Sequence, residues 1–71
     1  MILNITQMSI VAGNVLIAME KNGDFTTKHE LREKLEEESP LIDMGVGSLV
    51  KQGLVVVQPL EEDDYIVVRR K

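Results

Sequence analysis

The chain has 71 residues, of which 44% are apolar and 28% are charged, and it contains no cysteine and one histidine. At this length we expect one small core, since a chain of about 60 residues buries only about 60% of the surface that it exposes when unfolded. The absence of cysteine excludes disulfides and thiolate metal sites, and one histidine cannot build a histidine-ligated site alone. The formal net charge of −4 has the wrong sign for nonspecific binding to a phosphate backbone.

Targeting and linker signals are missing from the sequence. Residues 1–6 lack the basic region and the long apolar stretch of a signal peptide, and no apolar run approaches the ~18 residues that span a bilayer. We therefore expect a cytoplasmic protein with no membrane association. Without repeats or low-complexity linkers, we expect one domain over residues 1–71, with residues 1–5 as an N-terminal extension.

The first predicted helix covers residues 6–21. Six apolar residues recur there with the spacing of one helix face, which is typical of a helix packed on a core: Met8, Val11, Ala12, Val15, Leu16 and Met19. Asn22 and Gly23 follow, and both tolerate the left-handed backbone conformation that ends helices.

The second predicted helix covers residues 27–37, after a short connection. Thr27 and Glu30 have the spacing of a capping box at its N-terminus. Leu31 and Leu35 are expected on its buried side. Three consecutive glutamates end the segment, where the helix dipole disfavours negative charge, so the helix is expected to end or fray there.

The third predicted helix covers residues 40–52. Ser39 and Pro40 are typical of an N-cap followed by the first helical position, and Gly53 is expected to end the helix. Four apolar residues form its predicted core face: Ile42, Val46, Leu49 and Val50.

From Leu54 the pattern changes to runs of β-branched residues, first over residues 54–57 and again over residues 65–69. Four consecutive acids, Glu61-Glu62-Asp63-Asp64, separate the two runs. This pattern predicts a two-stranded β-hairpin over residues 54–69.

The stretch Leu49-Val50-Lys51-Gln52-Gly53-Leu54-Val55 resembles the segment by which winged-helix transcription regulators leave their recognition helix and enter the wing, the hairpin that follows it. Gly53 matches the left-handed position after the helix, and Leu54 the residue that packs back as the strand begins. The resemblance covers residues 8–69. It implies an α+β fold, a three-helix winged helix-turn-helix with a C-terminal two-stranded β-hairpin wing.

The resemblance also implies a DNA-binding transcription regulator, in which the outward face of the third helix enters the major groove. The residues expected on that face are Met44, Gly47, Ser48 and Lys51. The other candidate contacts are basic residues: Lys28, Arg32, Arg69 and Arg70. Because only Ser48 and Lys51 of the third helix offer groups that bind bases or phosphates, we expect binding to duplex DNA to be weak or dependent on a partner.

The acidic turn at residues 61–64 argues against DNA, since four carboxylates at the tip of a wing repel phosphates. The alternative prediction is a winged-helix module for protein–protein interaction or dimerisation that does not bind DNA. A continuous positive surface that joins Lys28, Arg32, Lys51 and the C-terminal tail would favour DNA, whereas dispersed charges would favour a protein partner.

Catalytic residues are not evident. His29 lies beside Glu30 with no nucleophile at a suitable spacing, and the carboxylates form solvated runs. The acidic turn lacks the alternating oxygen ligands and the glycine of an EF-hand loop. We therefore expect no enzyme, no metal site and no cofactor.

The first helix carries a second apolar face. Ile10 and Ile17 lie almost opposite its core stripe, with Gly13 and Asn14 nearby, and a helix that is apolar on two sides needs two partners. Either a second copy of the chain covers this face, or the apolar residues within the segment 2–5 fold over it. We expect a homodimer with these four helix residues at its interface, because a domain of this size gains most from added burial.

Overall fold

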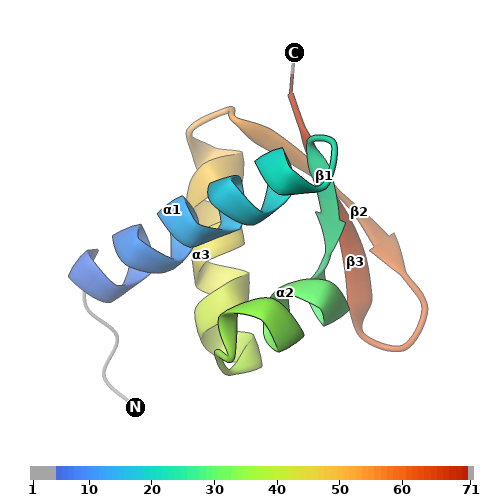
Figure 1. Cartoon of the computed structure of the whole chain (residues 1–71), viewed down its shortest axis with the longest axis horizontal. Coiled ribbons are helices and arrows are strands. Elements are labelled where there is room, and N and C mark those ends of the chain that lie inside the picture. Colours follow the sequence, from blue (N-terminus) through green and yellow to red (C-terminus); the bar gives the residue numbers. More distant parts are fainter. Residues whose placement is uncertain (1–4, 71) are drawn as a thin grey trace.

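A computed structural model describes residues 5–70, which form three helices and a three-stranded antiparallel sheet (Figure 1). In chain order the elements are α1 (Ile5–Lys21), β1 (Phe25–Thr27), α2 (Lys28–Leu35), α3 (Ser39–Lys51), β2 (Val55–Leu60) and β3 (Asp64–Arg69). The strand order is β1-β3-β2, so β3 is the central strand. The fold is α+β and is compatible with a winged helix. None of the described helices is long and apolar enough to cross a membrane.

The sheet has one strand more than the sequence predicts. Residues 25–27, which were expected to form part of a connection and the start of a helix, form the edge strand β1, in which Thr26 pairs with Val67 of β3. An aromatic residue and two β-branched residues favour this conformation, but three residues are too few to give a readable alternation. Thr26 is fully buried, and its hydroxyl has no hydrogen-bond partner among the described residues.

The second helix is shorter than predicted. Thr27 caps it, since the Thr27 hydroxyl accepts a hydrogen bond from the Glu30 amide at 3.1 Å. The helix ends at Leu35, and Glu36 takes a left-handed conformation with φ of 53°. The three glutamates thus lie beyond the helix, as expected from the helix dipole.

The ends of α3 follow the sequence signals with one change. The N-cap is Glu38 rather than Ser39, and Pro40 lies in the first turn. At the other end Gly53 has φ of 76°, and the Leu54 amide donates to the Leu49 carbonyl at 3.0 Å. This left-handed closure turns the chain directly into β2.

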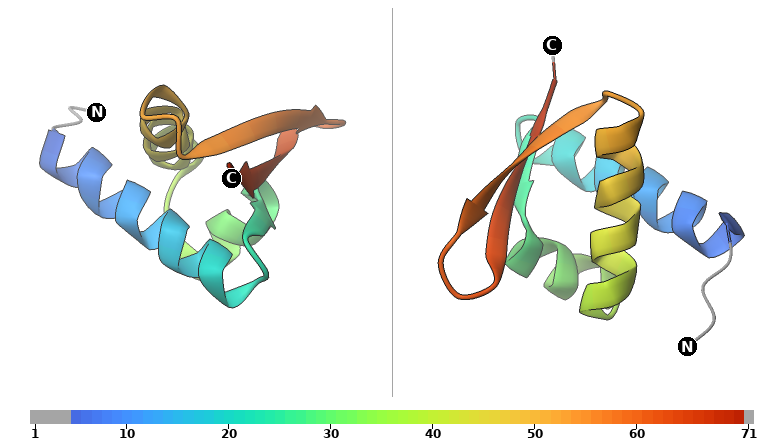
Figure 2. Two further views of the ribbon diagram at one scale, coloured as in Figure 1. Left: turned by 90° about the horizontal axis from the view of Figure 1, so that it is seen from above. Right: turned by 180° about the vertical axis from the view of Figure 1, so that it is seen from behind.

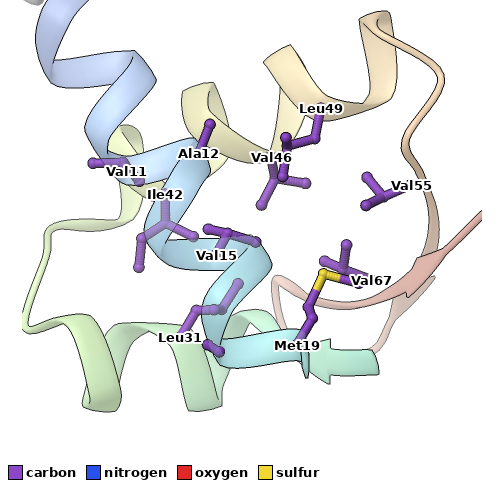
Figure 3. Packing of buried hydrophobic residues seen from close by; sticks show 11 residues of the cluster. Val11, Ala12, Val15, Met19, Leu31, Ile42, Val46, Leu49, Val55 and Val67 are labelled. Carbon is purple, nitrogen blue, oxygen red and sulfur yellow. The ribbon is translucent and has the colours of Figure 1, made fainter. Parts of the chain in front are cut away.

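The three helices and the inner face of the sheet enclose one apolar core, in which side chains of the helices and of the sheet point toward one another (Figure 3). Its buried members are Val11, Ala12, Val15, Ala18, Met19, Leu31, Ile42, Val46, Leu49, Val55 and Val67. Val50 was predicted in this core but is 44% exposed. The prediction was wrong because Val50 lies about 100° around the helix from Leu49 and faces the hairpin instead of α1.

Gly45, which had no distinctive signal in the sequence, allows α1 and α3 to approach one another closely. A methyl group on Gly45 would lie 2.7 Å from Cγ1 of Val11 and 3.2 Å from the backbone nitrogen of Ala12. The two helices therefore cross with the backbone of α3 directly against α1, at a distance that only glycine allows.

The hairpin of β2 and β3 projects from the helices, and its turn lies beside the start of α2 (Figures 1 and 2). Glu62 and Asp63 in this turn have left-handed φ values of 59° and 61°. The His29 amide of α2 donates to Asp64 Oδ1 at 3.2 Å, which ties the acidic turn to the helix N-terminus. A carboxylate in this position interacts favourably with the positive end of the helix dipole.

Candidate functional site

The outward face of α3 carries the residues that the winged-helix resemblance places there. Met44, Gly47 and Lys51 are exposed and Ser48 is partly buried. A Cβ atom on Gly47 would meet no atom within 4 Å, so this glycine leaves an open notch in the surface. The Ser48 hydroxyl accepts a hydrogen bond from the Gln52 side chain at 3.1 Å. Lys51 is therefore the one exposed cation that α3 offers.

Lys28 is buried, whereas a contact to phosphate needs an exposed cation. It is 5% exposed, and its Nζ lies 3.2 Å from Asp43 Oδ1 and 5.4 Å from the centre of the Tyr65 ring. The ammonium is thus held inside the fold by a carboxylate of α3 and an aromatic ring of β3. The positive charge of Lys28 is therefore paired within this cluster and is not exposed to a ligand.

Arg32 faces the acidic turn of the hairpin. Together with Lys28 and His29 it lines a shallow pocket of about 170 Å³ whose other wall is residues 61–64. Residues 61–64 thus place four carboxylates on the wall opposite Arg32. A phosphate approaching Arg32 would meet these carboxylates as well.

The basic residues at the C-terminal end of β3 lie at the other end of the sheet. Arg69 Nη1 lies 3.7 Å from Glu20 Oε1 of α1. The Arg70 amide donates to the Leu54 carbonyl at 2.9 Å, which places Arg70 at the same end of the molecule as the last turn of α3. The positive charges are thus dispersed: Lys51 and Arg70 are at one end, Arg32 is beside the acidic turn, and Lys28 is buried.

A groove of about 500 Å³ lies between α3 and the hairpin. We call it the α3–β2 groove. Its lining residues are Val46, Gly47 and Val50 of α3, Val57, Pro59 and Leu60 of β2, and a polar end of Lys28, Asp43, Asp63, Asp64 and Tyr65. Large apolar residues are partly exposed in it, with Val50 44%, Val57 38% and Leu60 46% exposed. Most of the groove is thus lined by apolar side chains, and one end is lined by charged and polar ones.

The charged end is built around Asp43. The Tyr65 hydroxyl donates to Asp43 Oδ1 at 2.7 Å, and the Lys28 ammonium lies 3.3 Å from Oδ2 of the same carboxylate. Burial and the hydrogen bond to Asp43 raise the pKa of Tyr65 far above its usual range. Three carboxylates against one ammonium leave this end of the groove negative.

The outer face of the sheet carries a second set of exposed apolar residues. Phe25, Val68 and Val56 lie side by side across β1, β3 and β2, and they are 43%, 38% and 47% exposed. Such cross-strand rows stabilise a sheet, and they also leave apolar area for a partner.

The exposed face of α1 contains the residues predicted at a dimer interface. Ile10 is 58% and Ile17 52% exposed, and a Cβ atom on Gly13 would meet no atom within 4 Å. The alternative cover, the segment 2–5, lies outside the described residues except for Ile5, which is 77% exposed. Along this face nothing charged is present from Ile5 to Met19.

The described residues contain no group of three or more His, Asp or Glu side chains that is arranged to hold a metal ion. His29 pairs with Glu33 one helical turn away, with Nε2 3.1 Å from Oε1, and both side chains are 70% exposed. This is a surface pair with the usual i, i+4 spacing.

Comparisons of the chain with protein-family models, with curated proteins and with solved structures find no match.

The α3–β2 groove is the feature that reasoning from the sequence missed. Its two walls come from elements that are joined by a turn, and only the folded hairpin shows that Val57 and Leu60 face the same space as Val50. One signal was present: three consecutive valines, 55–57, place an apolar side chain on both faces of a strand. The pairing of Lys28 with Asp43 spans fifteen residues and had no sequence signal.

Proposed function

We propose that this chain is a winged-helix domain that binds another protein through the α3–β2 groove and does not bind duplex DNA. The observation that carries the proposal is the character of this groove, which is apolar along its length and negative at one end. Exposed aliphatic residues around a concave site suit a protein surface, whereas base and phosphate contacts need donors and cations.

The assignment to the winged-helix class is supported by the order of the elements. Three helices are followed by a hairpin, and α3 leads into the hairpin through a left-handed glycine. The short strand β1 adds an edge to the hairpin without changing the relation between α3 and β2.

The dispersed cations support a protein partner over DNA. Counterion release needs several cations that face the phosphates together, and here Lys51 has no basic neighbour on α3. The acidic turn at residues 61–64 would add repulsion wherever the hairpin approached a duplex.

A fluorescence anisotropy titration with a random-sequence duplex at low salt tests the exclusion of DNA. We expect no binding by the wild type. Saturable binding that Lys51→Glu abolishes, and that becomes stronger when residues 61–64 are changed to their amides, would contradict the proposal and restore a DNA-binding regulator.

We further propose that the domain acts as a homodimer whose two-fold interface is the exposed face of α1. Two copies that each carry a net charge of −4 repel one another, so they associate best through an uncharged surface. The face around Ile10 and Ile17 meets this condition, and Gly13 at its centre allows two helices to approach closely.

Sedimentation equilibrium tests the dimer. Ile10→Ser together with Ile17→Ser should give monomers that keep the helical circular dichroism of the wild type. A matched control, Val56→Ser together with Val68→Ser, removes exposed apolar area from the outer sheet face and should leave the dimer intact. A monomeric wild type, or a dimer lost only in the control pair, would contradict the α1 interface.

A further inference from the structure

We infer that the partner of the α3–β2 groove is a linear segment of a different protein in which an aliphatic side chain lies next to an arginine or a lysine. This inference rests on the proposed function and adds the chemistry of the partner. It follows from the two parts of the groove, because the apolar part suits an aliphatic side chain and the acidic end suits a cation.

The apolar part of the groove accepts an aliphatic side chain. Val50 on one wall and Val57 and Leu60 on the other are each more than one third exposed. On the α3 wall, the missing side chain of Gly47 leaves room, since a Cβ atom there would meet no atom within 4 Å. An aliphatic side chain placed there removes apolar surface from water on both walls.

Asp63 is the most exposed of the three carboxylates at the acidic end of the groove. Asp43 is already bound by the Lys28 ammonium and by the Tyr65 hydroxyl. Asp64 Oδ1 accepts hydrogen bonds from the amides of His29 and Tyr65, at 3.2 Å and 2.8 Å. The Asp63 side chain, by contrast, is 98% exposed, and its ion pair with the Lys28 ammonium is long, with Nζ 4.0 Å from Oδ2.

Asp63 therefore presents a negative charge at the rim of the groove, where a cation of the partner can bind it. The neighbouring acids Glu61 and Glu62 are also exposed and strengthen the field that attracts a basic group. An arginine or a lysine next to the aliphatic residue gives this complementarity.

Other occupants fit the groove less well. A phosphate-bearing ligand is repelled by the same carboxylates. A second copy of the chain carries the same net charge of −4. We therefore assign the groove to a segment of a different protein, which binds independently of the α1 interface.

A selection from a random-peptide phage library on the immobilised 71-residue chain tests the inference. We expect the enriched peptides to share an aliphatic residue beside Arg or Lys. A synthetic copy of one enriched peptide then serves as the probe in fluorescence anisotropy.

Gly47→Leu should weaken binding of this peptide by about tenfold or more, because the new side chain would project from the α3 wall of the groove into the space that the peptide occupies. The variant keeps the fold, since leucine is a better helix former than glycine and meets open space. Gly47→Ala, which adds one methyl group, should weaken binding much less.

Asp63→Asn should weaken binding several-fold at low salt and much less at high salt, as expected for an exposed charge pair. The matched control is Asp24→Asn, because Asp24 is also an exposed aspartate in a left-handed conformation, with φ of 68° against 61° for Asp63. Asp24→Asn should bind the peptide as the wild type does.

The outcomes separate this inference from the proposed function. Enriched peptides that lack a basic residue, or that bind Asp63→Asn as tightly as the wild type, overturn the inference but leave a protein-binding groove. Binding that Gly47→Leu leaves unchanged would place the peptide outside the groove and would overturn the proposed function as well. Failure to enrich any peptide overturns the inference as well. Duplex binding that depends on Lys51 overturns the proposed function whatever the peptides show.

Discussion

Replacement of Gly45 by alanine tests how closely α1 and α3 approach one another. The new methyl group would lie 2.7 Å from Cγ1 of Val11, about 1 Å closer than the usual separation between carbon atoms in contact. Val11 is β-branched and strongly prefers one rotamer in a helix, so it cannot turn away. The backbone nitrogen of Ala12, 3.2 Å away, moves only with the whole of α1.

The size of the effect follows from two opposing contributions. Glycine to alanine within a helix stabilises the folded state by about 0.5–1 kcal/mol, because alanine loses less conformational entropy. Overpacking of a well-packed contact costs about 1–3 kcal/mol. Gly47→Ala on the same helix gains the first contribution without the second, since a Cβ on Gly47 meets no atom within 4 Å. The Gly45→Ala variant should therefore be less stable than Gly47→Ala by about 1–3 kcal/mol.

Urea unfolding followed by circular dichroism measures this difference. For a small domain with a slope of about 1 kcal/mol per molar urea, the two midpoints should differ by about 1–3 M. All variants are compared at one protein concentration, because unfolding of a dimer depends on concentration. Adding Val11→Ala to Gly45→Ala should recover part of the loss. Equal midpoints for Gly45→Ala and Gly47→Ala would show that the helices do not cross at Gly45.

Three further outcomes are expected. Leu49→Ala should destabilise the domain by about 2–5 kcal/mol, because Leu49 is 2% exposed within the core, and an unchanged urea midpoint would contradict this packing. Thr26→Val should raise the free energy of unfolding by about 1 kcal/mol, because it removes a buried hydroxyl without a hydrogen-bond partner, and a lower value would indicate that the hydroxyl is satisfied. Tyr65 is the only tyrosine, so absorbance at alkaline pH should show its ionisation midpoint above the ordinary value of about 10, and Asp43→Asn should lower this midpoint. Because the pKa of Tyr65 is raised in the folded state, its contribution to stability is complete below the unfolded pKa and is lost as the pH rises through the folded pKa, a loss that Tyr65→Phe should not show.

The helices could be read from the sequence because each signal was local. The apolar spacing of α1, the Thr27 cap of α2 and the glycine after α3 each depend on residues within a few positions of one another. Their observed bounds lie within two residues of the predicted ones.

The features that the sequence did not reveal depend on contacts between distant segments. Strand β1 exists because β3 offers it a hydrogen-bonding edge. The burial of Lys28 depends on Asp43, and the role of Gly45 depends on Val11 of another helix. In the sequence, a basic residue near a helix start looks the same whether or not a carboxylate lies opposite it. A glycine within a helix likewise looks the same whether or not another helix packs against it.

The two proposed interfaces are compatible with one another. Helix α1 packs on the Gly45 side of α3, whereas the groove borders the Gly47 and Val50 side. A dimer formed through the exposed face of α1 thus leaves the grooves free, and it would present two binding sites to a partner with repeated segments.

Amide chemical shifts of the labelled protein at low salt show whether the α3–β2 groove binds a protein segment or duplex DNA. The enriched peptide and a random-sequence duplex are added to separate samples, and the signals of Gly47, Val50 and Val57 are followed. We expect the peptide to shift these signals and the duplex to leave them unchanged. Shifts of Gly47 and Lys51 on addition of the duplex, with none on addition of the peptide, would contradict it.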